Sequence, residues 1–287
     1  MGFKQRQIKH LLIITTITFN LFTWMSCTPG NKGTGSLKED AIVVDETEHL
    51  FNDDTKPACN LHIQFSFIAQ SNDAHIKDSL NRIFIKQVFG EPYMYQTPQE
   101  AVQSYTTNYT KAYHSNLEPI FSEDINNTSR PETVAAWYNY EQSRKSIIER
   151  YEQNLLVYRL DTYEYTGGAH GIYGSFFTNI DLHYLRIIHL NDIFMSGYEA
   201  PLANLIWGQI KKDCKAENDE EMEALGYGII GEVTATENFA IRKEGIEFYY
   251  NVYEIAPYAS GATSVIVPYN QLKSLLRQDY QIVKEQL

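Results

Sequence analysis

Residues 165–174 read "YTGGAHGIYG", a stretch in which two adjacent glycines and a histidine lie between tyrosines. Runs typical of β-strands occur just before and just after it, near 153–165 and 174–183. Because glycine adopts positive φ angles at little cost, the paired glycines are expected to turn the chain from one strand into the next. The predicted structural turn consists of Gly167, Gly168, His170 and Gly171.

A catalytic role for this stretch would make His170 a general base or a metal ligand. A base needs an orienting carboxylate, and a zinc site needs further ligands at suitable spacing. His183 and His189 lie six residues apart, which is no recognised ligand pattern, and HExxH and GxSxG motifs are missing. We therefore predict no catalytic residue, no metal site and no cofactor. Paired carboxylates for glycoside chemistry stay open in a chain with 36 acidic residues.

Working outward, the region before the glycines reads as strand, helix, helix and strand. "LHIQFSFIA" (61–69) alternates apolar and polar residues, and 74–90 carries an apolar stripe at helical spacing. Thr97 and Glu100 form a capping box that starts a second helix. A further strand is expected near 133–147. The order predicts helices packed on an antiparallel sheet.

The region after the glycines also contains predicted helices and strands, but its sequence does not repeat that of the region before them. A helix is predicted over 201–214, and "KEG" (243–245) marks a hairpin whose second strand runs over 246–255. The segment 264–268 is a last strand. We expect an α+β protein of two small domains, each with helices packed on a mainly antiparallel sheet.

The N-terminus predicts export. Three basic residues within the first nine precede an apolar stretch over 11–22, which is shorter than the roughly 20 residues of a spanning helix. "WMSC" (24–27) follows and is typical of a bacterial lipoprotein signal, with cleavage before Cys27 and acylation of that residue. An uncleaved anchor and an ordinary secretory peptide are the alternatives. The expected location is the cell envelope, as an outer-membrane lipoprotein facing the periplasm or the exterior.

The composition of residues 28–56 defines the remaining predicted segment. Residues 28–56 are rich in Gly, Thr and charged side chains, which indicates a flexible tether. The predicted segments are a signal peptide (1–26), a tether (27–56), a first α+β domain (57–184) and a second α+β domain (185–287).

Charge and cysteine content limit the partners. The formal net charge is -12, so nucleic acid and anionic surfaces repel the chain, whereas a basic protein is attracted. We predict no nucleic-acid partner, and contact with the membrane through a lipid on Cys27. Cys59 and Cys214 remain, and sequence leaves a disulfide or two free thiols open.

A second unusual stretch, "APYASG" (256–261), ends a predicted strand with a proline and a tyrosine. A rigid loop that presents tyrosine suits binding, because the ring adds contact area at low entropic cost. The alternative is that Tyr258 packs this loop onto the sheet.

These stretches resemble a known family. "YTGGAHGIY" (165–173), "LNDIF" (190–194) and "GIEFYYNVYEIAPYASGATSVIVPY" (245–269) are similar, in order and spacing, to the extracellular part of RsiV-type proteins. The resemblance covers about residues 60–280 and pairs a PdaC-like domain with an RsiV-like domain.

RsiV is a transmembrane anti-sigma factor whose exterior domain binds lysozyme, and PdaC joins the first domain to a polysaccharide deacetylase. Ten residues precede the apolar stretch here, so we expect no sigma-binding domain. The resemblance implies a non-catalytic, lipid-anchored envelope module that binds a lysozyme-like protein or peptidoglycan. A cell-wall glycan- or peptide-modifying enzyme and a scaffold subunit of an envelope complex are the alternatives. The predicted ligand-binding residues are Glu254, Pro257, Tyr258 and Ser260.

Overall fold

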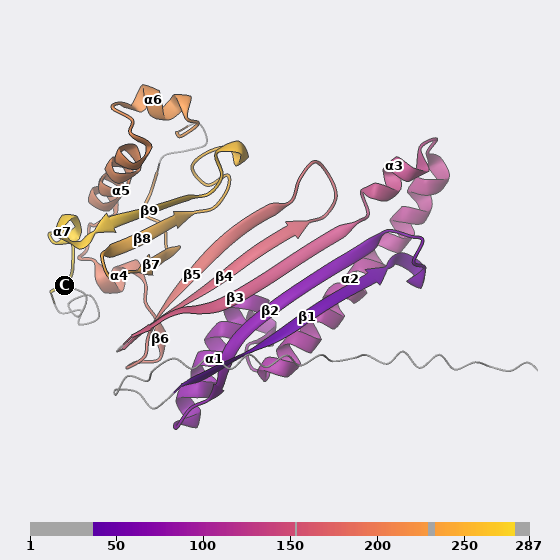
Figure 1. Cartoon of the computed structure of the whole chain (residues 1–287), viewed down its shortest axis with the longest axis horizontal. Coiled ribbons are helices and arrows are strands. Elements are labelled where there is room, and N and C mark those ends of the chain that lie inside the picture. The colour runs from indigo at the N-terminus through magenta and orange to yellow at the C-terminus, as the bar shows by residue number, and fades with distance from the viewer. Residues whose placement is uncertain (1–36, 153, 229–232, 279–287) are drawn as a thin grey trace, which may run out of the picture.

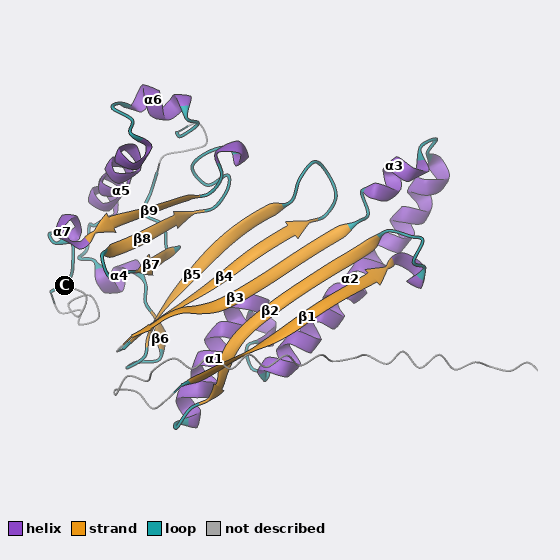
Figure 2. Ribbon diagram, viewed as in Figure 1, coloured by secondary structure: helices purple, strands orange, loops and turns teal. Residues whose placement is uncertain are grey.

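The computed structural model describes residues 37–152, 154–228 and 233–278, so the predicted signal peptide and Cys27 lie outside the described residues. Within these ranges, six strands form the larger sheet, in the order β1-β2-β3-β4-β5-β6 (Figures 1 and 2). β2 and β3 are parallel, and the other neighbouring pairs are antiparallel. The strands are β1 (Lys38–His49), β2 (Ala58–Gln70), β3 (Tyr140–Glu152), β4 (Leu155–Tyr165), β5 (Ile172–Asp181) and β6 (Arg186–Ile187).

A smaller antiparallel sheet, three-stranded in the described part of the chain, follows in the order β7-β8-β9. Its strands are β7 (Phe239–Ile241), β8 (Gly245–Tyr250) and β9 (Thr263–Pro268). Helices on a mainly antiparallel sheet, with a small second sheet, confirm the predicted α+β class. The division into two domains at 184/185 stays a prediction, and β6 pairs with β5 and so belongs to the larger sheet.

The longest helix, α2, has 30 residues, and none of the helices in the described ranges is long and apolar enough to span a membrane. The helical segments are α1 (Ala74–Phe89), α2 (Pro98–Asn127), α3 (Pro131–Ala136), α4 (Leu190–Ile193), α5 (Glu199–Cys214), α6 (Asp219–Ala224) and α7 (Tyr269–Leu272), with 3₁₀ turns η1 (Leu50–Asn52), η2 (Glu91–Tyr93) and η3 (Tyr258–Ser260).

α1 and α2 cover one face of the larger sheet (Figure 1). Phe84 of α1 stacks on Tyr158 of β4 with ring centroids 4.0 Å apart, and the Tyr158 hydroxyl donates to the carbonyl of Ser66 (2.8 Å). α2 starts at the predicted capping box, where the Thr97 hydroxyl accepts from the Glu100 amide and the Glu100 carboxylate accepts from the Thr97 amide. Local capping and an apolar stripe thus place the helical layer.

β4 contributes to two hydrophobic cores. Leu156 and Tyr158 face the helices, whereas Leu155 and Val157 pack in one core with Phe248 and other residues of the small sheet. All four of these β4 residues are at most 1% exposed. A strand buried on both faces reads as a continuous apolar run, which explains why "LLVY" does not alternate.

The free edge of β5 is closed by side-chain amides. Asn238 accepts from the amide of Phe177 (2.9 Å) and donates to the carbonyl of Ser175 (2.8 Å). Asn251 accepts from the amide of Ser175 (2.7 Å). Buried or partly buried edge groups without partners are costly, so these asparagines replace the strand that would otherwise pair there.

Asn179 makes the reciprocal connection from β5 to β7. Its amide nitrogen donates to the carbonyl of Phe239 (2.7 Å), and its oxygen accepts from the amide of Ile241 (2.8 Å). Asn179 is 1% exposed, so both bonds lie in the interior. The small sheet is therefore held against β5 by hydrogen bonds as well as by apolar packing.

The prediction of a flexible tether over 27–56 is wrong for residues 38–56, and 27–36 lie outside the described part. Residues 38–49 form β1, which pairs with β2 along its length. Ile42 and Val44 pack on the helix-side core, and Leu50 at the end of the strand is fully buried. The charged side chains that suggested a tether lie on an edge strand, where charge protects against unwanted pairing.

Two other predicted strands are shorter than expected. α3 takes the first part of 133–147, because Pro131 and Glu132 start a helix there, and β3 begins at Tyr140. The predicted strand over 246–255 ends at Tyr250. The chain turns at Asn251, whose side chain is bonded to β5.

Cys59 and Cys214 are free thiols. Cys59 lies among Tyr113, Phe121 and Tyr138 in a core under η1 and α3, whereas Cys214 is the last residue of α5. Burial raises the pKa of the Cys59 thiol to about 11. Of the two alternatives that the sequence left open, the structure has the unpaired thiols.

We expect Asn179→Ala to lower the free energy of unfolding by about 2 kcal/mol, because both hydrogen bonds to β7 are lost in the interior. Urea unfolding followed by circular dichroism measures the change. Asn72→Ala, in the exposed loop before α1, is the matched control and should change stability by less than about 0.5 kcal/mol. An equal effect in both variants would contradict the role of the asparagine bridge.

In the folded protein, Cys59 should resist alkylation by iodoacetamide at about pH 8, since the thiolate is the reactive form and burial suppresses it. Cys214, which is half-buried, should react faster. Both should react at similar rates in denaturant, as followed by peptide mass spectrometry. Rapid labelling of Cys59 without unfolding would show that its core opens.

Candidate functional site

The two unusual stretches of the sequence meet in space. The β4–β5 connection carries His170, and the loop that follows β8 carries Tyr258. Their rings stack with centroids 4.0 Å apart and an interplanar angle of 20°. The Tyr258 hydroxyl also donates to the carbonyl of Gly171 (3.1 Å). The glycine turn and the "APYASG" loop thus form one surface.

Two more tyrosines extend this surface. Tyr253 lies with its hydroxyl 3.4 Å from Nε2 of His170, and Tyr173 stands edge-on to Tyr258 with ring centroids 5.8 Å apart. Tyr253 is 45% exposed and Tyr173 is 36% exposed, and His170 is exposed as well. We call His170, Tyr173, Tyr253 and Tyr258 the aromatic cluster. Three of its four rings are exposed, and Tyr258 is half-buried between them.

Tyr253 is held in an unfavourable backbone conformation. Its φ angle is +69°, in the left-handed region that bulky side chains rarely adopt. The turn is fixed on both sides, because Glu254 accepts from the amide of Asn251 (2.9 Å) and the Glu254 amide donates to the Asn251 carbonyl (3.1 Å). Strain at an exposed aromatic residue that its surroundings maintain is typical of functional sites.

The four predicted ligand-binding residues differ in whether their side chains already have partners within the protein. The Glu254 carboxylate is used within its own turn, and the Ser260 hydroxyl donates to the carbonyl of Leu225 (3.2 Å). Pro257 packs close to Gly226, where a Cβ would lie 3.0 Å from its ring. Tyr258 belongs to the aromatic cluster. Contact of these residues with a ligand stays a prediction.

The predicted turn residues lie in the β4–β5 connection. Gly167 and Gly168 have φ angles of +86° and +101°. A Cβ on Gly167 would collide with the carbonyl oxygen of Trp137, whereas one on Gly168 would meet nothing within 4 Å. A Cβ on Gly171 would come within 2.6 Å of the ring of Tyr163. The glycines let the loop lie flat against its neighbours, which sets the position of His170.

Several carboxylates of the two sheets are paired with arginines. Glu149 of β3 binds Arg159 (2.9 Å) and Arg242 (2.6 Å), and these arginines also bind Asp161 and Glu247 respectively. The hydrogen bond from Arg159 to Asp161 raises the pKa of the guanidinium. The chain of ion pairs joins the two sheets, so these carboxylates have a structural role and do not form a free acid–base pair.

Elsewhere, the described ranges contain no group of three His, Cys, Asp or Glu side chains that could hold a metal ion. A pocket of about 390 Å³ lies on the helix side of β3, β4 and β5. There, Arg144 donates to the carbonyl of Val88 (2.6 Å) and Gln142 donates to Glu164 (3.2 Å). These polar groups of the pocket are bound within the protein already.

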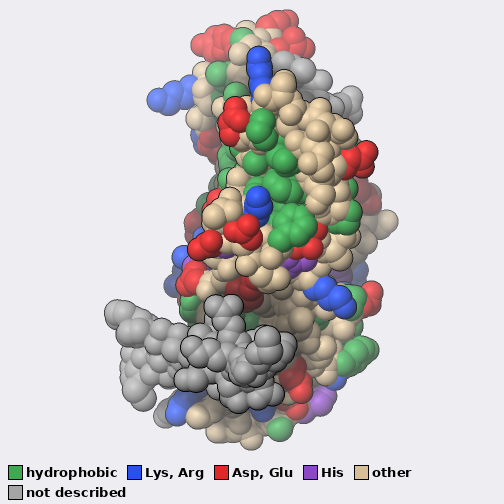
Figure 3. Space-filling view, turned by 90° about the vertical axis from the view of Figure 1, so that its right-hand side faces the viewer, with side chains coloured by type: hydrophobic (Ala, Val, Ile, Leu, Met, Phe, Trp, Pro, Cys, Tyr) green, Lys and Arg blue, Asp and Glu red, His purple; other side chains and the backbone are tan. Residues whose placement is uncertain are grey.

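Hydrophobic side chains also gather where α2 ends and α3 lies, with acidic side chains around them (Figure 3). Phe51, Ile120 and Trp137 are the exposed large apolar residues of η1 and of this part of the helical layer, and each is more than 40% exposed. Phe51 packs against Phe121 of the small core that contains Cys59, with ring centroids 6.0 Å apart. An apolar patch with a polar rim is typical of contact surfaces.

Comparison with solved structures identifies the family. A DUF3298 family member from Bacteroides fragilis is 45% identical to this chain and has a TM-score of 0.85 to it, covering 89% of this chain and 99% of that one. The chain belongs to the DUF3298 family. The DUF3298 model, which describes a protein of unknown function, matches residues 191–270, from α4 into α7. The aromatic cluster therefore lies partly inside the matched region, through Tyr253 and Tyr258.

Two further proteins are similar to this chain. A DUF3298 protein from Pseudomonas aeruginosa is 16% identical with a TM-score of 0.60, covers 85% of this chain and 95% of its own, and shows the same fold. The chain is also 26% identical over 135 residues to the peptidoglycan-N-acetylmuramic acid deacetylase PdaC of Bacillus subtilis. That match covers 46% of this chain and 28% of PdaC, so the chain spans little more than a quarter of that relative. It supports the predicted likeness to PdaC.

Sequence reasoning missed Tyr173 and Tyr253. Tyr253 was assigned to a strand, although Asn251 and Glu254 have the spacing of a capping box, which signals a turn. Tyr173 carried no signal, because its place beside Tyr258 arises from packing between distant parts of the chain.

Gly167→Ala should destabilise the protein more than Gly168→Ala. Both substitutions place a side chain at positive φ, which costs about 1 kcal/mol, and the first adds a collision with the Trp137 carbonyl. Urea unfolding of the two variants makes the comparison, with Gly168→Ala as the matched control. Equal losses would show that the loop moves away from Trp137 without cost.

Proposed function

We propose that this DUF3298 protein is a non-catalytic binding module of the cell envelope and that the aromatic cluster contacts its partner. The observation that carries the proposal is a cluster of four rings from two loops and the start of β5, three of them exposed and one, Tyr253, on a strained backbone. Such rings bind well because they bury much area and lose little conformational entropy. The Asn251 bridge to β5 and the hydrogen bond from Tyr258 to Gly171 hold the two loops in place before any partner arrives, which favours affinity.

The proposed partner is a basic, lysozyme-like protein or peptidoglycan. A net charge of -12 attracts a basic protein and raises the rate of encounter. The resemblance to the exterior part of RsiV-type proteins supports a lysozyme-like partner, and the match to a deacetylase named for peptidoglycan supports the cell wall. We further propose that a lipid on Cys27 anchors the module at the outer membrane.

Two other functions have some support. The match to PdaC favours an enzyme that acts on cell-wall glycan, with carboxylates other than the arginine-paired Glu149, Asp161 and Glu247. Turnover of purified peptidoglycan by the protein would establish that function. The apolar patch where α2 ends and α3 lies (Figure 3) favours a scaffold subunit, which would co-purify with another envelope protein.

Titration calorimetry with a lysozyme, and separately with soluble peptidoglycan fragments, tests the binding proposal. We expect Tyr253→Ala to weaken binding by about tenfold or more, since a central aromatic contact is commonly worth above 1 kcal/mol. Binding of lysozyme should weaken further at high salt, whereas peptidoglycan binding should depend less on salt.

The matched control is Tyr184→Ala, which removes a tyrosine that is 67% exposed outside the cluster. Tyr258→Phe is a second probe that keeps the ring stacked on His170 and removes only the hydroxyl. Absence of heat with either ligand, or an equal loss in Tyr184→Ala, would refute the role of the aromatic cluster.

A further inference from the structure

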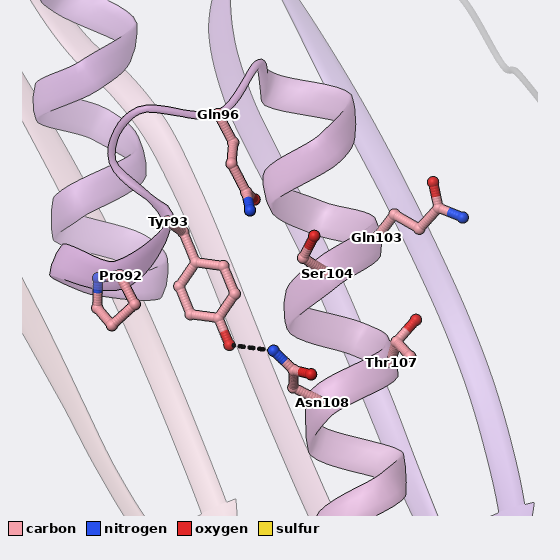
Figure 4. Close-up of a pocket in the computed structure, with 7 residues that line it drawn as sticks. All are labelled: Pro92, Tyr93, Gln96, Gln103, Ser104, Thr107 and Asn108. Atoms are coloured by element: carbon pink, nitrogen blue, oxygen red, sulfur yellow. Dashed lines mark hydrogen bonds between the residues drawn. The ribbon is translucent and has the colours of Figure 1, made fainter.

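A second pocket lies away from the aromatic cluster, between the η2 turn and α2 (Figure 4). Its volume is about 440 Å³, within the range of small-molecule sites. None of the side chains that line it is charged, although the chain as a whole is acidic. The lining residues are Pro92, Tyr93, Gln96, Gln103, Ser104, Thr107 and Asn108.

Gln96 has an unmade hydrogen bond in this pocket. Its side chain points into the space between Tyr93 and Ser104 (Figure 4), and its Oε1 atom is buried without a partner. A buried amide oxygen that accepts no hydrogen bond costs about 1–3 kcal/mol. A hydroxyl or N–H group of a ligand that reached this oxygen would remove the cost, which favours a ligand with a hydrogen-bond donor.

The opposite wall is fixed in advance. The Tyr93 hydroxyl accepts from the side-chain amide of Asn108 (3.1 Å), as Figure 4 shows. The ring of Tyr93 also packs edge-to-face against Phe89 and Tyr105, with centroids 6.5 and 5.8 Å away. A held aromatic ring beside amides and hydroxyls binds ligands that have one apolar face and several hydroxyl groups.

Two acidic side chains close to the lining in sequence are engaged elsewhere. Glu91 of η2 pairs with Lys86 (3.4 Å), and Glu100 caps the start of α2 through Thr97. A charged ligand would therefore lose its hydration without gaining a counter-charge from the lining, which is unfavourable. The pocket selects for uncharged polar ligands.

We propose that this pocket binds an uncharged sugar unit, with the ring of Tyr93 against the sugar face and Gln96 Oε1 accepting from a hydroxyl or an acetamido N–H. This site is separate from the aromatic cluster and does not depend on the function proposed for it. An acetamido sugar supplies both kinds of donor and should bind at least as well as a plain hexose.

Saturation-transfer NMR on the purified protein, with N-acetylglucosamine and with glucose, tests the proposal. We expect transfer to the neutral sugars and little transfer to glucuronate. Gln96→Leu should weaken binding by about tenfold or more, and its melting temperature should stay equal or rise because the unpaired buried oxygen is gone. Loss of binding without loss of stability separates a binding role from a structural one.

Gln99→Leu is the matched control, because Gln99 lies three residues after Gln96, in the first turn of α2 and outside the lining. It should bind the sugars like the unmodified protein. Failure of both neutral sugars to bind up to their solubility, or unchanged binding in Gln96→Leu, would overturn the proposal. Glucuronate binding as well as glucose would contradict the selection for uncharged ligands. Lysozyme titration with Gln96→Leu should be unaffected, so failure here is distinguishable from failure of the aromatic cluster.

Discussion

The architecture depends on how the edge of β5 is closed. Asn238 and Asn251 supply amide groups where a further strand would supply backbone. This arrangement requires a close approach, because a Cβ on Gly174 would lie 2.8 Å from the Asn251 oxygen. Since Asn251 also begins the loop that carries Tyr253 and Tyr258, one set of hydrogen bonds fixes both the packing of the two sheets and the assembly of the aromatic cluster.

Elements with local signals could be predicted from sequence, and elements that depend on distant partners could not. The capping box at Thr97 and the apolar stripe of α1 are complete within one turn or one helix face, and both are present. β1 was missed because its charged composition describes its exposed edge, whereas its stability comes from pairing with β2. Propensity alone does not contain that contact.

The candidate site shows the same limit. The glycine turn and the "APYASG" loop were each recognisable as unusual, yet nothing in either stretch indicated that Tyr258 would stack on His170. The hydrogen bond beside this stack, from the Tyr258 hydroxyl to the Gly171 carbonyl, joins residues 87 positions apart in the sequence. The stack of Tyr258 on His170 depends on the core that β4 shares with the small sheet. It could therefore be predicted only once the packing on both faces of β4 was known.

The length and direction of β1 determine how far the start of this strand lies from the β4–β5 connection. β1 has 12 residues, so its two ends are about 40 Å apart. The pairing from β1 through β4 makes these two strands run in the same direction, and Tyr165 therefore lies at the His49 end of the sheet. The point where the chain enters β1 and the β4–β5 connection that carries His170 therefore lie at opposite ends of the larger sheet. Because the sheet is rigid, a partner bound at the aromatic cluster would be held about 40 Å from the start of β1.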